Sequence, residues 1–171
     1  MNVDFINNKS IKKQWNEIWP TNGDKAGINW DAVGCSGDLI ILVEAKAHAK
    51  EIVQSMGATN SGSIDMIKKA FSNLCQDFQL QLNDSWFNEY YQLANHLVAI
   101  HFLVSRGFKA KLLNLYFIHG YEIDAHGKKK DVNLSVKSQE EWQKIIDEQH
   151  RKMQISGNPI ENYITNLFID C

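Results

Sequence analysis

The sequence predicts an α/β (α+β) domain with a small mixed central sheet flanked by helices on both faces. The apolar run from Leu39 to Val43 has no alternation, which is typical of a strand covered on both faces. A second apolar run, from Lys109 to Ile118, is also a strong strand candidate. Segments 10–19 and 63–78 instead place their apolar residues at helical spacing. Strands separated by helices favour a sheet covered by helices.

Length and composition indicate one domain covering residues 1–171. The chain is 44% hydrophobic and 22% charged, with no repeat or linker-like tract. We expect a core at about residues 10–118, with a strand and helices in 131–169 as additions. The formal net charge is −2, so the composition does not indicate a broad nucleic-acid surface, and any such role depends on a local site.

Nothing in the sequence indicates a membrane or secretory protein. The apolar runs are far shorter than the ~20 residues that span a bilayer, and the N-terminus lacks the pattern of a secretory signal. The three cysteines are Cys35, Cys75 and Cys171, and none forms a CxxC pair. This usage suits a reducing compartment, so we expect a cytoplasmic protein.

The N-terminal third predicts one helix followed by two strands. The helix begins near Ser10 and ends at Pro20, and residues 21–27 read as a loop. A short strand is expected over 28–33, then a turn at Gly34 to Gly37, then a central strand over 38–47.

The rest of the chain predicts mainly helices. Ser63 is the expected N-cap of a helix to Phe78, and a buried helix follows over 86–106, ended by Gly107. Val132, Leu134 and Val136 alternate as a weak edge strand. The later expectations are a capping box at Ser138 and Glu141 that opens a helix, and a last helix from Asn158-Pro159 that buries Ile160, Ile164, Leu167 and Phe168.

The chemically informative stretch is the end of the apolar strand. Glu44 and Lys46 follow the run directly, and a strand period of two places them on the same face. Because a buried charge is costly, the two must be satisfied by each other, by solvent in a cleft or by a bound cation. Asp31 on the preceding strand could supply a second carboxylate.

The register of the two strands decides whether these carboxylates meet. If Asp31 lies opposite Glu44, Val33 faces Leu42, and we expect residues 34–41 to form a long turn or bulge. A four-residue turn at 34–37 would instead put Asp31 opposite Ile40. The two registers differ by roughly 13 Å along the strand, so only the first lets the carboxylates share an ion.

Two carboxylates beside a lysine suit a hard divalent ion. Mg²⁺, or Mn²⁺, takes oxygen ligands and keeps several waters, and one of these, oriented by the metal and Lys46, can attack phosphorus. The metal and the lysine would also stabilise the charge that develops on the phosphoryl oxygens. The chemistry that these residues predict is phosphodiester hydrolysis.

Asp31, twelve further residues and then Glu44-Ala45-Lys46 resemble the motif of the PD-(D/E)xK nuclease superfamily, the restriction-endonuclease-like fold. The resemblance covers about residues 10–110. It implies that Asp31, Glu44 and the carbonyl of Ala45 are metal ligands and that Lys46 positions or activates the water. The family core is usually αβββαβ, whereas this sequence shows two clear strands before the central helices.

Several other residues are weaker candidates for substrate contacts, and each has a structural explanation as well. His48 continues the strand face of Lys46, and Glu17 could be the extra acid that some family members carry on the first helix; both could equally be surface residues. Gln92 and Asn95 interrupt a buried helix and either line the cleft or are satisfied in the core. The basic residues that could contact phosphate, or simply be solvated, are Lys109, Lys111 and Lys128 to Lys130.

Two functional hypotheses follow. The first is a Mg²⁺-dependent endonuclease acting on DNA through Asp31, Glu44 and Lys46, with a homodimer as one arrangement, since many members of the superfamily cut both strands as dimers. The second is a catalytically inactive DNA-binding or protein-interaction module on the same fold. The sequence contains no phosphate-binding loop, dinucleotide fingerprint, HExxH motif or GxSxG motif, which disfavours those enzyme classes.

Overall fold

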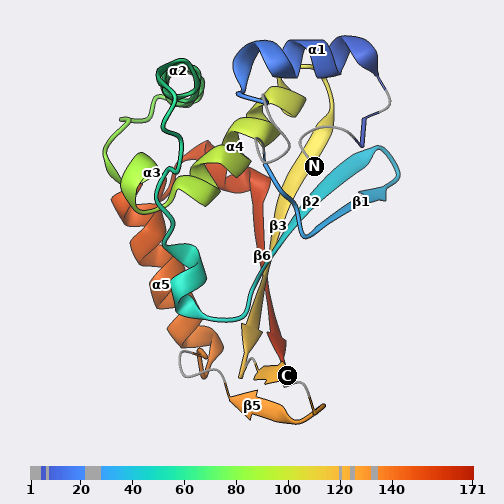
Figure 1. Ribbon diagram of the computed structural model, residues 1–171, viewed down its shortest axis with the longest axis vertical. Helices are drawn as coiled ribbons and strands as arrows, with labels where there is room; N and C mark the ends of the chain where they lie inside the picture. The colour runs from blue at the N-terminus through green and yellow to red at the C-terminus, as the bar shows by residue number, and fades with distance from the viewer. Residues whose placement is uncertain (1–4, 7, 22–27, 120, 124–125, 132–134) are drawn as a thin grey trace.

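A computed structural model describes residues 5–6, 8–21, 28–119, 121–123, 126–131 and 135–171. Its centre is a mixed four-stranded sheet of order β1-β2-β3-β6. In this sheet β1 is antiparallel to β2, whereas β2 and β3, and β3 and β6, are parallel neighbours. The strands are β1 (Ala32–Ser36), β2 (Leu39–Lys46), β3 (Lys109–Ile118) and β6 (Ile164–Asp170). The predicted mixed α+β class is confirmed (Figure 1).

The remaining elements are helices and one small hairpin. The α-helices are α1 (Lys9–Ile18), α2 (Ser61–Asp77), α3 (Ser85–Asn88), α4 (Tyr91–Val104) and α5 (Gln139–Lys152). Two 3-10 helices, η1 (Ala49–Ile52) and η2 (Pro159–Tyr163), connect elements, and β4 (Tyr121–Ile123) pairs with β5 (Lys129–Asp131). None of the helices in the described part of the chain is long and apolar enough to cross a membrane.

The helices cover one face of the sheet. In β3 the buried side chains are Ala110, Leu112, Asn114 and Tyr116, which alternate along the strand and therefore share a face. α5 packs on that face through Trp142, whose ring centroid lies 4.8 Å from that of Tyr116. Figure 1 shows α2 to α5 on one side of the sheet.

The opposite face is apolar but only partly covered. Its side chains include Val43, Leu113 and Leu115, which are half-buried, and Leu167, which is exposed. None of them belongs to the hydrophobic core or packs against it. The expectation of helices on both faces is therefore wrong for the described residues, because an unbroken apolar run does not show by itself that both sides of a strand are buried.

Aromatic side chains join the helical layer into one core. Trp15 of α1 lies 5.0 Å from Phe102 of α4 between ring centroids, and Trp19 lies 6.2 Å from Phe71 of α2. All four of these side chains are at most 2% exposed. Burying aromatic rings removes a large apolar area from water, so this cluster holds α1, α2 and α4 together.

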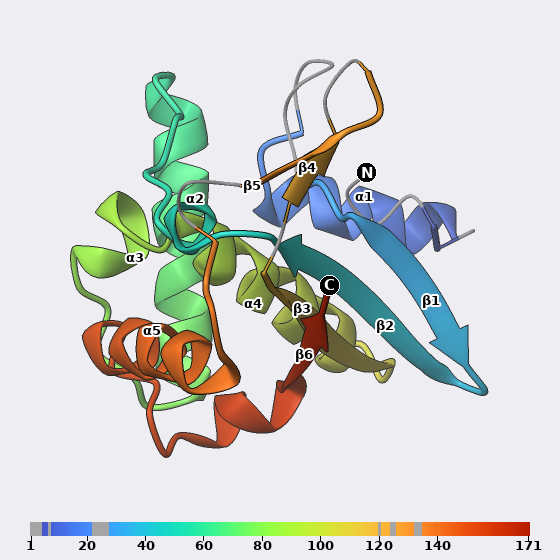
Figure 2. The same ribbon diagram turned by 90° about the horizontal axis from the view of Figure 1, so that it is seen from below.

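The β1–β2 hairpin has the register that the site requires but not the expected turn. Val33 pairs with Leu42, as predicted for the register that brings Asp31 and Glu44 together. Pairing then continues to Ser36 and Leu39, so the expected long turn or bulge over 34–41 is wrong. A two-residue turn suffices because Gly37 has φ 61°, a conformation that glycine adopts without a steric penalty (Figure 2).

The expected long helix over 86–106 is divided into α3 and α4. The backbone N–H of Gln54 donates to the carbonyl of Glu89 at 2.7 Å, and the N–H of Tyr91 donates to the carbonyl of Gln54 at 3.0 Å. These backbone groups would otherwise be available to a continuous helix. A neighbouring segment therefore ends α3 and begins α4, which apolar spacing alone could not indicate. Gly107 has φ 82°, as expected for the residue that ends this helical region.

The predicted last helix is wrong. Asn158 does cap a helical turn, but η2 ends at Tyr163 and the chain continues as β6. Ile164, Leu167 and Phe168 fit a helical spacing, yet the segment is rich in β-branched and aromatic residues and pairs along β3. Of the weak strand expected at 132–136, residues 132–134 lie outside the described residues, and Val136 is buried outside any strand.

Candidate functional site

Asp31 directly precedes β1 and lies beside the end of β2 that carries Glu44. The paired register of the two strands ends at Ala32 and Val43. The N–H of Asp31 donates to the carbonyl of Val43 at 3.1 Å. In a regular continuation of the antiparallel ladder, Asp31 would pair with Glu44 and its N–H would not donate to Val43, so Asp31 departs from the ladder at this point. Asp31 nevertheless lies close enough to Glu44 for its charge to act on the Glu44 carboxyl.

The Asp31 carboxylate is exposed and held in place by the strand beside it. Its Oδ2 accepts a hydrogen bond of 2.7 Å from the backbone N–H of Ala45. This bond fixes Asp31 next to the peptide between Glu44 and Ala45. The Asp31 carboxylate therefore lies at the C-terminal end of β2, close to Glu44.

Glu44 and Lys46 form a buried pair on the helix-covered face. Glu44 is 6% exposed and Lys46 is 8% exposed, and Lys46 Nζ donates to Glu44 Oε1. Gln92 of α4 connects both: its Nε2 donates to Glu44 Oε1 at 2.7 Å, and its Oε1 accepts from Lys46 Nζ at 2.6 Å. Gln92 was expected either to line the cleft or to be satisfied in the core, and the structure places it beside Glu44 and Lys46.

Two opposing influences act on Glu44. Burial raises the pKa of this carboxyl above its ordinary value, and the negative charge of Asp31 raises it further, whereas Lys46 and Gln92 lower it. The influence of Asp31 means that the two carboxylates lie close enough to repel each other. A cation between them would relieve that repulsion.

His96 lies beside Glu44 in the same cavity, a position that the sequence did not predict. It is 2% exposed, its Nε2 lies 3.7 Å from Glu44 Oε2, and its ring lies 4.3 Å from that of Trp30 between centroids. Burial and the charge of Lys46 lower the pKa of His96 to about 3. The imidazole is therefore neutral near pH 7 and does not form an ion pair with Glu44.

A small cavity of about 20 Å³ opens among these side chains. A cavity of this size has room for about one water molecule. Besides Glu44, Lys46, Gln92 and His96, its polar lining residues are Asn114, Tyr116 and Gln149.

Sequence analysis missed these last three residues, although two carried a signal. Asn114 is a polar residue inside the apolar run of β3, and Gln149 lies on the otherwise apolar face of α5. Asn114 donates from Nδ2 to Asn166 Oδ1 at 3.0 Å. Gln149 is 5% exposed and brings a residue of the C-terminal region to the site.

The other predicted contact residues lie elsewhere or have other partners. Lys109 forms an ion pair of 2.7 Å with Asp38 and is level with Leu39, five residues, or roughly 16 Å, along β2 from Glu44. His48 pairs with Glu51 at 3.0 Å. Glu17 lines a different cleft, of about 350 Å³, between α1, α2 and α4. None of the three reaches the Glu44 cavity in this structure.

Asn95 and the remaining basic candidates also stay outside the cavity. Asn95 Oδ1 is buried and has no hydrogen-bond partner among the described residues. Lys111 and Lys128 are exposed, and the side chains of Lys129 and Lys130 lie outside the described part of the structure.

The acidic residues that the motif would use for a metal ion are Asp31 and Glu44. Across the described ranges, no group of three or more His, Cys, Asp or Glu side chains could hold a metal ion. Mg²⁺, however, is commonly bound through one or two carboxylates and retains several waters. Asp31 and Glu44 would be two such carboxylates, and one oxygen of Glu44 already accepts a hydrogen bond from Lys46.

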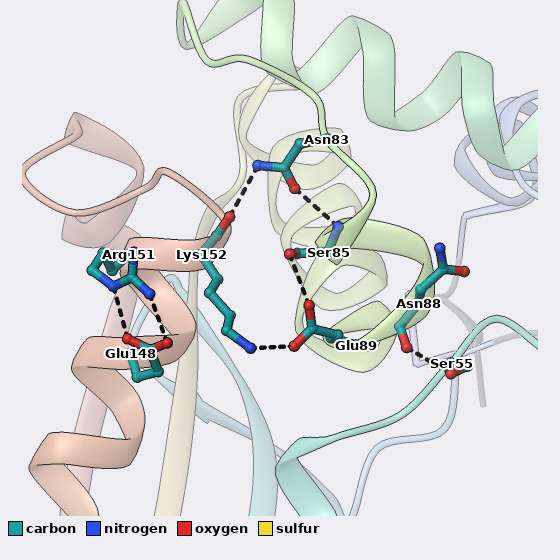
Figure 3. A network of polar contacts seen from close by, with 8 residues as sticks. All are labelled: Ser55, Asn83, Ser85, Asn88, Glu89, Glu148, Arg151 and Lys152. Atoms are coloured by element: carbon teal, nitrogen blue, oxygen red, sulfur yellow. Dashed lines mark hydrogen bonds and ion pairs between the residues drawn. The ribbon is translucent and has the colours of Figure 1, made fainter.

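A second polar network lies on the helical side, where α5 meets α3 (Figure 3). Lys152 Nζ donates to Glu89 Oε2 at 2.5 Å, and Asn83 Nδ2 donates to the carbonyl of Lys152 at 2.9 Å. Arg151 makes two hydrogen bonds of 2.7 Å to Glu148. These groups are partly or fully exposed and join helix ends, so we interpret this network as structural.

Comparisons with known protein families, with curated proteins and with solved structures found no match to this chain.

Proposed function

We propose that this chain is a metal-dependent nuclease-like protein that hydrolyses phosphodiester bonds of DNA at Asp31, Glu44 and Lys46. The observation that carries the proposal is the position of Asp31 beside Glu44, where its carboxylate accepts a hydrogen bond from the N–H of Ala45 and its charge acts on the Glu44 carboxyl. The order of elements, a helix, the hairpin, further helices and a parallel strand, supports the resemblance to the PD-(D/E)xK superfamily in part, since two described strands rather than three precede the helices.

Each residue has a distinct role in this proposal. Asp31, Glu44 and the carbonyl of Ala45 would hold Mg²⁺ or Mn²⁺. Bound there, the ion would acidify a water molecule and offset negative charge on the phosphoryl oxygens. Lys46 would position or activate that water, or contact a phosphoryl oxygen, through its hydrogen bonds. Gln92 holds Lys46 and Glu44 at the spacing this requires.

The charge balance limits how DNA would be bound. With a net charge of −2, we expect DNA binding to depend on local contacts rather than on a wide basic surface. The carboxylate pair is itself repulsive toward phosphate until a cation is bound. Metal binding is therefore expected to precede DNA binding at this site.

The second candidate is the same fold without turnover, acting as a DNA-binding or protein-interaction module. The observation that favours it is the closed state of the cluster: Lys46 is bonded to both Glu44 and Gln92, and the cavity has room for about one water. In this alternative the ion pair is a permanent structural element. The two candidates differ in whether Asp31 and Glu44 bind a divalent ion.

The direct test is cleavage of single-stranded, double-stranded and branched DNA, and of RNA, with Mg²⁺, Mn²⁺ or a chelator. Asp31→Asn, Glu44→Gln and Lys46→Ala should each reduce cleavage by about 100-fold or more. Asp38→Asn and Lys109→Met are matched controls, because they alter an exposed ion pair between the β1–β2 turn and the start of β3. Cleavage that survives both Glu44→Gln and Lys46→Ala would place catalysis elsewhere.

Calorimetry with Mn²⁺ separates the two candidates independently of cleavage. Asp31 is exposed, so Asp31→Asn should leave the fold intact while abolishing Mn²⁺ binding. Wild-type protein that binds no Mn²⁺ and cuts no substrate would favour the inactive module.

A further inference from the structure

The outer edge of β6 is open in the described structure. β6 is the last strand in the sheet order, and no described strand pairs with its outer side. It is seven residues long, against five for β1 at the opposite edge. An unpaired edge carries a row of backbone donors and acceptors that can pair with another chain.

β6 lacks the features with which soluble proteins commonly protect such an edge. Its sequence contains no proline and no lysine, and its only charged residue is Asp170 at the end. Leu167, the middle residue, is 50% exposed. Among the described residues, Val53 is the only other exposed large hydrophobic residue. It is 58% exposed and lies outside the sheet.

We propose that β6 pairs antiparallel with β6 of a second copy of this chain, extending the sheet across a two-fold axis at Leu167. A two-fold axis perpendicular to a sheet makes its edge strands antiparallel, and the same surface is then used by both copies. Backbone hydrogen bonds along such an edge supply affinity, as in other cases of strand addition.

The sequence of β6 is self-complementary in this register. Centring the pairing on Leu167 sets this leucine against its own copy and sets Thr165 against Ile169, all on the partly covered face. On the other face Asn166 opposes Phe168. Asp170 opposes Ile164, so the two copies of Asp170 lie at opposite ends of the interface and do not repel each other.

The surroundings of β6 also favour a second copy over a charged partner. Leu113, Leu115 and Ile169 are half-buried on the same face, so pairing through β6 would join two apolar surfaces into one. β6 has no cationic side chain to attract nucleic acid. The Glu44 cluster lies on the helix-covered face, so this dimer would leave both candidate sites unobstructed.

The test is the mass of the native chain in solution, measured by light scattering after gel filtration and by sedimentation over a wide range of concentration. We expect a reversible dimer in the wild type and a monomer in Leu167→Lys. Val53→Lys is the matched control, because it places the same charge at the other exposed hydrophobic position and should leave the dimer intact. A wild type that is monomeric throughout overturns the proposal.

Cross-linking tests the register itself. In a background with Cys35→Ser and Cys171→Ser, which removes both exposed thiols, Leu167→Cys should form a disulfide between copies on mild oxidation. Opposed residues at the axis have Cα atoms within the roughly 4.4–6.8 Å that a disulfide bridges. Val53→Cys in the same background should not cross-link at a comparable rate. A dimer that persists in Leu167→Lys, or equal cross-linking at the two positions, would place the interface elsewhere.

Discussion

Two lysine–glutamate pairs in this protein make the same contact in different surroundings. Counted over side-chain atoms alone, Lys46 and Glu44 are 10% and 8% exposed beneath the helices, whereas Lys152 and Glu89 are 36% and 38% exposed where α5 meets α3 (Figure 3). The pKa of Glu44 is raised, mainly because of burial, while the pKa of Glu89 is lowered, mainly by its hydrogen bond from Lys152. Solvent access, rather than the identity of the partner, therefore decides how strongly a carboxylate is stabilised.

The largest difference is expected when the lysine of each pair is removed. Lys46→Met leaves Glu44 buried without its cation, and breaking one side of a buried pair costs about 3–5 kcal/mol. Urea unfolding followed by tryptophan fluorescence measures this loss, since Trp15, Trp19, Trp86 and Trp142 are all buried. A loss of unfolding free energy below about 1 kcal/mol would mean that water reaches Glu44 in solution, as it reaches the charges of an exposed ion pair.

Removing both charges of the buried pair should restore most of this stability. In Glu44→Gln combined with Lys46→Met, the new amide can pair with Gln92, which bonds to both residues in the wild type. We expect unfolding free energy within about 1–2 kcal/mol of the wild type, because replacing a buried ion pair is often neutral. The same urea titration tests it. Additive losses in the double variant would show that the two charges do not compensate each other.

The features that sequence could predict are those encoded locally. The unbroken run before Glu44 predicted β2, and the capping box of Ser138 and Glu141 predicted the start of α5, where the N–H of Glu141 donates to Ser138 Oγ at 3.2 Å. The spacing of Asp31 and Glu44 predicted that they could meet. Each of these signals lies within a short stretch of chain.

The features that sequence missed depend on distant segments. The division between α3 and α4 is set by Gln54, and β6 is a strand because β3 lies beside it. In the site, Gln149 comes from a helix more than a hundred residues after Glu44 in the printed sequence. Tertiary contacts override local spacing in all three cases. The spacing of residues along a single sequence does not indicate which distant segments will come into contact.

The exposed pair should contribute far less than the buried one. We expect Lys152→Met to lower stability by at most about a quarter of the loss in Lys46→Met, because side-chain ordering and solvent screening offset most of an exposed attraction. Parallel urea titrations of the two variants give the ratio directly. Equal losses would mean that the α3–α5 junction depends on Lys152 as strongly as the sheet depends on Lys46.

The smallest expected effect is the response of the exposed pair to acid and salt. Because Lys152 lowers the pKa of Glu89, this carboxylate stabilises the native state at pH values above its ordinary pKa of 4.5. That contribution is lost as the pH falls through the lowered native value. The difference in stability between the wild type and Lys152→Met should therefore be constant near neutrality and shrink progressively below about pH 4.5.

Added salt near 1 M should also reduce the stability difference between the wild type and Lys152→Met, since the screening length is then about 3 Å, while the deficit of Lys46→Met should persist. Urea titrations at several pH values and two salt concentrations measure both trends, and a Lys152→Met deficit that ignores acid and salt would mean that lost packing of the lysine stem, rather than lost charge, destabilises the variant.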